Sequence, residues 1–396
     1  FLMYGDPEKV KEVSKSSFSH VEVLSAIHDK QLRLFFQPKI DMTSGEIIGF
    51  EALVRWQHPS RGLLSPIEFL PSINESDVEV LLGQFVIKEA LKCLENWHKY
   101  GLKLRVSINL SAYHLARSSF IKSLEKICNE FPGLDLSFFQ IEILESHALD
   151  ELSSIQTVIA ECKEKFDISM ALDDFGTGYS SLSHIRTLPI KTIKIDQSFV
   201  RNMLNDADDY KIVESVISLA NSFNIEVIAE GVESVKHAQI LLCMGCKIAQ
   251  GYAIARPMPA ASVLEWACNF YIPELIAIEN DQNDCLKTSQ LRLLIHFLEI
   301  EYEFLKNNIQ SKTNSNVPLI ASTHSHCGFW LKKAKSTQFI EAHQQEQLEN
   351  HYSTLLNSIA NTHVLHQCGD ITSAMIGFEE IEEGYKNLIN LVNNLF

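Results

Sequence analysis

The sequence contains no apolar stretch long enough to cross a bilayer, and it has a deficit of positive charge. A membrane-spanning helix needs about 20 mostly apolar residues, so we predict no membrane span in this chain. Lys and Arg number 34 against 50 Asp and Glu, which gives a formal net charge of −16. General nucleic-acid binding needs a cationic surface, and so acidic a chain is a poor candidate for it.

The nine cysteines are odd in number and show no spacing typical of a disulfide framework. Free thiols are typical of a reducing compartment, which predicts a cytoplasmic location. The first residue is Phe1 rather than Met, so we expect the chain to be a fragment or a processed product. The hydrophobic fraction of 46% is ordinary for a globular protein that buries a core.

Between about residues 31 and 270, strand patterns alternate with helix patterns. The first two strands are joined by turn residues around Gly45, and so short a link allows only an antiparallel hairpin. The later strands are separated by helical segments long enough for parallel crossovers. Eight strands therefore predict an α/β fold, a (β/α)8 TIM-like barrel with an antiparallel first strand. The predicted strands are 34–37, 47–54, 104–110, 139–144, 168–172, 192–195, 226–229 and 248–252.

The pattern changes on either side of this barrel. Residues 1–30 are predicted to be a lead-in helix and linker, and residues 271–288 are a second linker rich in Pro, Asn, Asp and Gln. Residues 289–396 contain amphipathic runs near 290–308, 339–360 and 373–395. They predict a small all-helical bundle with a regulatory or dimerising role.

Polar side chains stand at the carboxyl ends of the predicted strands, which converge on one mouth of a barrel. Carboxylates gathered at one place repel unless cations neutralise them. Hard oxygen ligands favour Mg²⁺ or Mn²⁺ over zinc. One of two adjacent aspartates could bridge a pair of ions, the usual apparatus for in-line phosphate displacement. The strand-end residues are Glu51, Asn109, Glu142, Asp173, Asp174, Lys194, Glu230 and Gln250.

Each of these residues also has an ordinary structural interpretation. Glu51 could be a hydrogen-bonded strand end, Asn109 a turn cap, and the segment 173–178 a tight glycine turn. Lys194 stands between two isoleucines, and Lys is seldom buried without a partner. The coincidence of polar groups at successive strand ends favours the functional interpretation for the set.

The segment Phe50–Trp56 resembles the signature of the EAL phosphodiesterases, which open cyclic di-GMP to the linear dinucleotide. The resemblance runs from about Leu32 to Pro259 and keeps the order of several motifs. These are 36–38 (FQP), 109–111 (NLS), 141–145 (IEILE), 173–178 (DDFGTG), 194–196 (KID), 229–233 (AEGVE) and 250–252 (QGY).

The resemblance implies a role for each matching residue. Glu51, Asn109, Glu142 and Asp173 would hold one metal ion, and Asp173 would bridge to a second ion held with Asp174 and, directly or through water, Glu230. Lys194 would lie beside the attacking water, Gln250 would orient water, and Glu145 would steady the loop after Asp174. Gln37, Arg55, Asp196 and Glu233 would contact the substrate.

The function so implied is hydrolysis of cyclic di-GMP to linear pGpG with two Mg²⁺ or Mn²⁺ ions, in bacterial second-messenger signalling. One alternative is a catalytically silent cyclic di-GMP receptor that signals through the helical tail. Another is a pure interaction scaffold, which would have no need of Gln37, Arg55 or Lys194. Because no catalytic position is lost, the sequence favours the enzyme.

Seven of the 15 histidines lie in the tail, which faintly resembles the zinc-binding helical bundles of bacterial signalling proteins, the CZB type. Alignment on Gly328–Trp330 places Ser325, Glu301 and Gln347 at ligand positions and leaves His351 as the one strong ligand. A shifted register would use His296, Cys327 and His351. A closed structural zinc site usually needs four ligands, so we predict a bundle without structural zinc that supports a homodimer or regulates the barrel.

Overall fold

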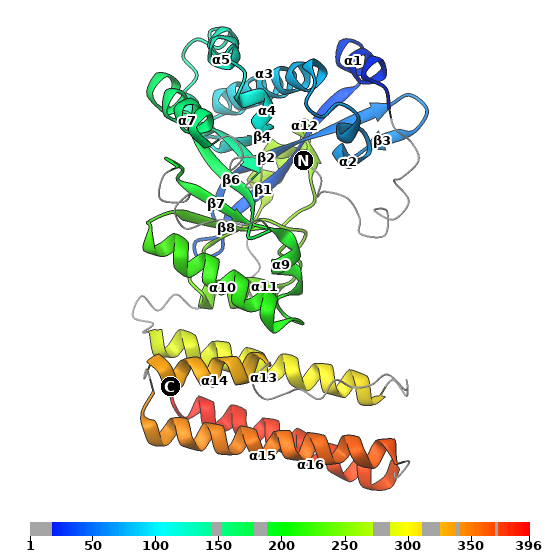
Figure 1. Cartoon of the computed structure of the whole chain (residues 1–396), viewed down its shortest axis with the longest axis vertical. Coiled ribbons are helices and arrows are strands. Elements are labelled where there is room, and N and C mark those ends of the chain that lie inside the picture. The colour runs from blue at the N-terminus through cyan, green and yellow to red at the C-terminus, as the bar shows by residue number, and fades with distance from the viewer. Residues whose placement is uncertain are drawn as a thin grey trace. The chain divides into compact units, whose positions relative to one another are not determined.

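The computed structural model describes residues 18–144, 152–177, 188–271, 286–310, 325–337, 340–368 and 371–396 (Figure 1). The chain forms two compact units. The first comprises Phe1–Ser198, Val216–Ser234 and Cys246–Ala277, and the second comprises Phe199–Ser215, Val235–Gly245 and Ile278–Phe396. In the described part of the chain, no helix is long and apolar enough to span a membrane.

The first unit contains a closed barrel of eight strands. The barrel order is β1-β9-β8-β7-β6-β5-β4-β2, and β2 pairs again with β1. Two short strands, β3 (Gly62–Leu64) and β10 (Met258–Pro259), extend the sheet by pairing with β2 and β1. The barrel strands are β1 (Leu32–Asp41), β2 (Ile47–His58), β4 (Arg105–Asn109), β5 (Phe139–Leu144), β6 (Ser169–Phe175), β7 (Thr192–Ile195), β8 (Glu226–Ala229) and β9 (Ile248–Ala249).

Strand β1 runs antiparallel to both of its barrel neighbours, β2 and β9, whereas the other barrel pairs are parallel. The link between β1 and β2 is too short for the crossover that parallel pairing requires. The Asp41 side chain accepts the backbone N–H groups of Thr43 and Ser44 and so stabilises this turn. The predicted TIM-like barrel with a reversed first strand is confirmed.

Helices cover the outer face of the strands in the first unit (Figure 1). Helix α3 begins after Ser76, whose hydroxyl accepts the backbone N–H of Glu79, and its Trp97 packs against Phe36 and Phe50. These aromatic rings are fully buried and join the helix layer to β1 and β2. The covering elements include α1 (His20–His28), α2 (Pro66–Phe69), α3 (Asp77–Lys99), α4 (Ala112–Leu115), α5 (Phe120–Cys128), α7 (Leu152–Phe166) and α12 (Ala260–Asn269).

The second unit contains four tail helices: α13 (Leu286–Gln310), α14 (His326–Thr337), α15 (Ala342–Gln367) and α16 (Ile371–Asn393). The amphipathic runs predicted three of them and missed α14. The unit also takes in α11 (Val235–Cys243) and the beginning of α10 (Ala207–Ser222).

Specific contacts hold the second unit together. The Tyr210 ring packs edge-on against Phe297, with ring centroids 4.8 Å apart. A ring nitrogen of His326 lies 2.7 Å from the carbonyl oxygen of Met203, and the Trp330 indole donates to the carbonyl oxygen of Gln290 at 2.8 Å. The tail therefore packs against segments that lie between the last strands of the barrel in sequence.

Candidate active site

The Lys194 ammonium lies at the centre of a cluster of carboxylates. Its Nζ is 2.5 Å from Glu230 Oε1, 2.7 Å from Glu142 Oε2, 3.0 Å from Asp173 Oδ1 and 3.4 Å from Glu51 Oε2. The side chains of Lys194, Glu51 and Glu142 are fully buried, and those of Glu230 and Asp173 nearly so. These residues come from separate strands, whose ends the barrel brings to one place.

The carboxylates form two sets that could each hold a metal ion. Glu51, Glu142 and Asp173 offer oxygen atoms within 4.8 Å of one another, and so do Asp173, Asp174 and Glu230. Asp173 belongs to both sets, as expected for a bridging ligand. Such oxygen-only sets suit hard divalent cations such as Mg²⁺ or Mn²⁺.

The charges in the cluster do not balance. Burial raises the pKa values of Glu51 and Glu230 despite the nearby Lys194. Burial also acts to raise the pKa of Glu142, but two lysines outweigh it and lower this pKa to about 2. Burial, Asp173 and Asp196 raise the pKa of Asp174 to about 8. Five carboxylates stand against two lysines in this cluster, so bound cations would relieve the repulsion between the negative charges.

Amide side chains connect the cluster to the rest of the mouth. Asn109 Nδ2 donates to Glu51 Oε1 at 2.6 Å. Gln250 Nε2 donates to Glu51 Oε2 at 2.6 Å and to Gln37 Oε1 at 3.1 Å, and Gln37 Nε2 donates to the carbonyl oxygen of Ala255. These bonds fix the orientation of Glu51 across the seam between β1, β2 and β9.

The second lysine of the cluster, Lys39, is absent from the sequence predictions. It is buried on β1, and its Nζ lies 2.5 Å from Glu142 Oε1 and 2.6 Å from Ser107 Oγ. Lys39 follows Gln37 by two positions, so strand alternation places both on the same face. That alternation was the available signal, because β1 also contains Arg33 and Asp41 and so lacks the apolar surroundings that identified Lys194.

The remaining predicted residues lie at different depths. Asp196 is fully buried; its carboxylate helps to raise the pKa of Asp174, and it accepts the backbone N–H of Ser198 at 2.9 Å, near the start of α9 (Gln197–Asn202). Arg55 is half-buried on β2, four residues beyond Glu51, and Glu233 is exposed after β8. Glu145 lies outside the described residues. The substrate contacts and the role of Glu145 stay predictions.

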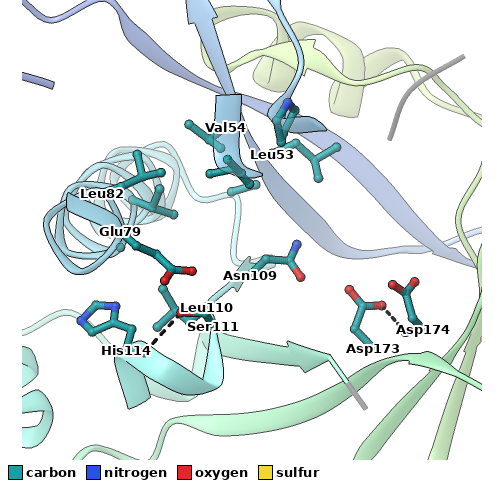
Figure 2. A pocket seen from close by; sticks show the side chains of 15 residues that line it. Leu53, Val54, Glu79, Leu82, Asn109, Leu110, Ser111, His114, Asp173 and Asp174 are labelled. Carbon is teal, nitrogen blue, oxygen red and sulfur yellow. Dashed lines mark hydrogen bonds between the residues drawn. The ribbon is translucent and has the colours of Figure 1, made fainter. Parts of the chain in front are cut away.

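A largely apolar pocket opens beside the acidic cluster (Figure 2). Its lining includes Leu53, Val54 and Leu82. Asn109, Asp173 and Asp174 belong to both the pocket wall and the cluster. His114 also lines the pocket, and burial lowers its pKa to about 4, so this imidazole is neutral at ordinary pH.

In the tail, two of the aligned zinc positions, Glu301 and Ser325, belong to one hydrogen-bonded network. Tyr352 donates to Glu301 Oε2 at 3.0 Å, its hydroxyl lies 2.8 Å from Ser325 Oγ, and the backbone N–H of Cys327 donates to Glu301 Oε1. His351 is exposed. Within the described ranges, the two barrel sets are the groups that bring three candidate metal-binding side chains together. A tail without structural zinc remains a prediction.

The sequence profile of the EAL domain matches residues 20–257, more than half of the chain. The chain belongs to the EAL domain family. The chain is 35% identical over 260 residues to the cyclic di-GMP phosphodiesterase PdeR of Escherichia coli. The aligned region covers 66% of this chain and 39% of PdeR. The chain is also 35% identical over 238 residues to the cyclic di-GMP phosphodiesterase PA2567 of Pseudomonas aeruginosa, 60% of this chain and 40% of that protein. The chain thus spans about two fifths of the length of these relatives.

Solved EAL structures share the fold. The MucR phosphodiesterase in complex with cyclic di-GMP superposes with a TM-score of 0.59 at 33% identity, over 62% of this chain and 99% of that structure. The EAL domain of Mycobacterium smegmatis DcpA gives a TM-score of 0.52 at 32% identity, over 61% and 100% respectively. Both matches span nearly all of the solved domain.

Proposed function

We propose that the EAL barrel hydrolyses one phosphodiester bond of cyclic di-GMP and releases linear pGpG. The observation that carries the proposal is the set of four carboxylates within 3.4 Å of the buried Lys194 ammonium, which come from β2, β5, β6 and the residue after β8. The relatives named as cyclic di-GMP phosphodiesterases supply the substrate. A silent receptor is less well supported, because none of the described ligand positions is lost.

Two divalent cations, Mg²⁺ or Mn²⁺, are proposed for the cluster. Glu51, Asn109, Glu142 and Asp173 would hold the first, and Asp173, Asp174 and Glu230 would hold the second. When bound, such a pair lowers the pKa of a water molecule and polarises the phosphoryl oxygens. The choice of Mg²⁺ or Mn²⁺ is supported by the ligand atoms, which are all oxygens, because these two ions prefer oxygen ligands.

The residues of the chain would assist the bond changes directly. Because pGpG keeps its terminal phosphate on a 5′ oxygen, the water oxygen bonds to phosphorus while the bond from phosphorus to the 3′ oxygen breaks. The attacking water gives up one proton and the departing 3′ oxygen takes up one, so the reaction adds one water molecule in total. The Lys194 ammonium stabilises the negative charge that develops on the phosphoryl oxygens, and the Gln250 amide orients the attacking water.

Substrate binding would use the space around the cluster. The apolar walls of the pocket, including Leu53 and Leu82, suit the face of a purine ring. Arg55 has the geometry to bind a phosphate through two N–H groups. Gln37, Asp196 and Glu233 are the other proposed substrate contacts, and Glu145 is proposed to steady the loop after Asp174.

The proposal is tested by incubating the chain with cyclic di-GMP and Mg²⁺ or Mn²⁺ and separating the nucleotides by liquid chromatography with mass detection. Accumulation of pGpG is expected from the wild-type chain. An exposed-site variant, Lys92→Met, should give the same product, because Lys92 pairs only with Glu89 on the surface of α3. A wild-type chain that binds cyclic di-GMP and leaves it intact would favour the silent receptor instead.

The helical tail and the location are further proposals. The tail helices are proposed to support a homodimer or to regulate the barrel, which light scattering and activity of the full chain before and after tail removal would distinguish. All eight cysteines in the described part of the chain are free thiols. This is typical of a reducing compartment, so the reaction is proposed to take place in the cytoplasm.

A further inference from the structure

We infer that Lys39 restricts Glu142 to one metal-binding oxygen and thereby makes the site selective for Mg²⁺ or Mn²⁺ over Ca²⁺. The inference rests on the proposed metal site and adds to it a residue that sets which metal is accepted. It follows from the positions of the two Glu142 oxygens relative to the two buried lysines.

The two oxygens of Glu142 have different neighbours. Oε2 lies 2.7 Å from Lys194 Nζ, which also contacts Asp173 Oδ1 and Glu51 Oε2, so Oε2 faces the other carboxylates of the cluster. Oε1 lies 2.5 Å from Lys39 Nζ. The carboxylate therefore offers one oxygen to the cluster and holds the other in a separate buried ion pair.

Lys39 approaches from deeper in the barrel. On β1, Gln37 pairs with Glu51 at the mouth, whereas Lys39 pairs with Gly49, two residues further from the mouth. A second bond, 2.6 Å from Lys39 Nζ to Ser107 Oγ, helps to keep the ammonium in place beneath Glu142. Both the ammonium and the carboxylate are shielded from water, so the bond between them is not readily exchanged for a bond to water.

Mg²⁺ and Ca²⁺ differ in how many oxygens of a carboxylate they bind. Mg²⁺ takes near-octahedral geometry and accepts single oxygens from carboxylates, whereas Ca²⁺ takes six to eight oxygens and often binds both oxygens of one carboxylate. For Glu142 to bind Ca²⁺ with both oxygens, the bond from Lys39 to Oε1 must break inside the protein. Mg²⁺ and Mn²⁺ need no such rearrangement, so Lys39 disfavours Ca²⁺ selectively.

The test compares metal affinities without substrate. Dissociation constants for Mg²⁺, Mn²⁺ and Ca²⁺ are measured by calorimetry on the chelated chain, for wild type, Lys39→Met and Ser107→Ala. In Lys39→Met, the affinity for Ca²⁺ relative to Mg²⁺ should rise about tenfold, the scale of one charge-assisted hydrogen bond. In Ser107→Ala, which keeps the Lys39–Glu142 pair, the ratio should change much less.

If a folded Lys39→Met chain kept the wild-type ratio of Ca²⁺ to Mg²⁺ affinity, or lost affinity equally for all three ions, the inference would be overturned. Lys39 would then have only a general structural role. If Lys39→Met does not fold, crystal structures of the wild-type chain with Mn²⁺ and with Ca²⁺ decide. Glu142 should bind both ions through Oε2, with Oε1 still on Lys39. Two-oxygen binding of Ca²⁺ by Glu142 would contradict it. Wild-type hydrolysis of cyclic di-GMP, assayed separately, shows whether the proposed function stands when this inference fails.

Discussion

Replacing Lys194 with methionine should make the stability of the EAL barrel depend on divalent metal. Methionine is similar in length but carries no charge, so the change removes the ammonium from among four carboxylates at 2.5–3.4 Å. Removing one partner of a buried ion pair costs about 3–5 kcal/mol. At roughly 2–4 °C per kcal/mol for a domain of this size, the metal-free variant should unfold roughly 6–20 °C below the wild type.

Bound metal should recover much of this loss, because the cations take over the neutralisation of Glu51, Glu142, Asp173 and Glu230. The assay is thermal unfolding followed by circular dichroism, in EDTA and in Mg²⁺. The Lys194→Met chain should gain more stability from Mg²⁺ than the wild type does. Lys92→Met is the matched control, since an exposed ion pair contributes about 0–1 kcal/mol and its loss should not alter the response to Mg²⁺.

Kinetics of the same variant separate chemistry from binding. Lys194→Met should lower kcat far more than it raises KM, because its proposed contact forms at the reacting phosphoryl group. If Lys194→Met in EDTA unfolded at the wild-type temperature, the electrostatic reasoning about the cluster would be wrong. A variant that changed only KM would refute the proposed role of Lys194 near the attacking water.

Four further outcomes are expected. Glu51→Ala should abolish pGpG formation in the chromatographic assay, because it removes a proposed metal ligand, and residual turnover near the wild-type rate would exclude that role. Arg55→Ala should raise KM more than it lowers kcat in steady-state kinetics, and the reverse pattern would place Arg55 at the reacting group. The pKa of Asp174 is raised from 3.8 to about 8, so the folded chain keeps this proton after the unfolded chain has lost it. Melting temperatures in EDTA should therefore fall as pH rises from about 4 to about 8, and this slope should weaken in Mg²⁺. Zinc-exposed chain should hold no tightly bound zinc by elemental analysis, whereas one zinc per chain that is lost in His351→Ala or Cys327→Ser would show a working tail site.

The barrel was predictable because its local patterns and its topology agree. The later barrel strands are short and mostly apolar, and the brief turn around Gly45 left only an antiparallel hairpin for the first two. The candidate site was predictable for the same reason. Once strand ends converge, Glu51 and Glu142 must lie close together despite their separation in sequence, and their side chains both contact Lys194.

The features that escaped prediction depend on side-chain reach and tertiary contacts. Lys39 lies two residues before the turn end of β1 and reaches Glu142 on β5, a contact that no spacing rule encodes. Helix α14 is short and contains Gly328, so its periodic signal is weak. The association of the tail with Phe199–Ser215 and Val235–Gly245 is made by contacts such as Tyr210 with Phe297, which appear only after folding.

The central claim is that the carboxylate cluster around Lys194 works through a pair of divalent cations in opening cyclic di-GMP. The most direct test removes all metal from the wild-type chain by exhaustive chelation and then adds Mn²⁺ stepwise while pGpG release is followed. The account predicts no turnover in the chelated chain and full recovery as about two ions bind per chain. Full turnover in the chelated chain, or recovery complete after a single ion, would contradict it.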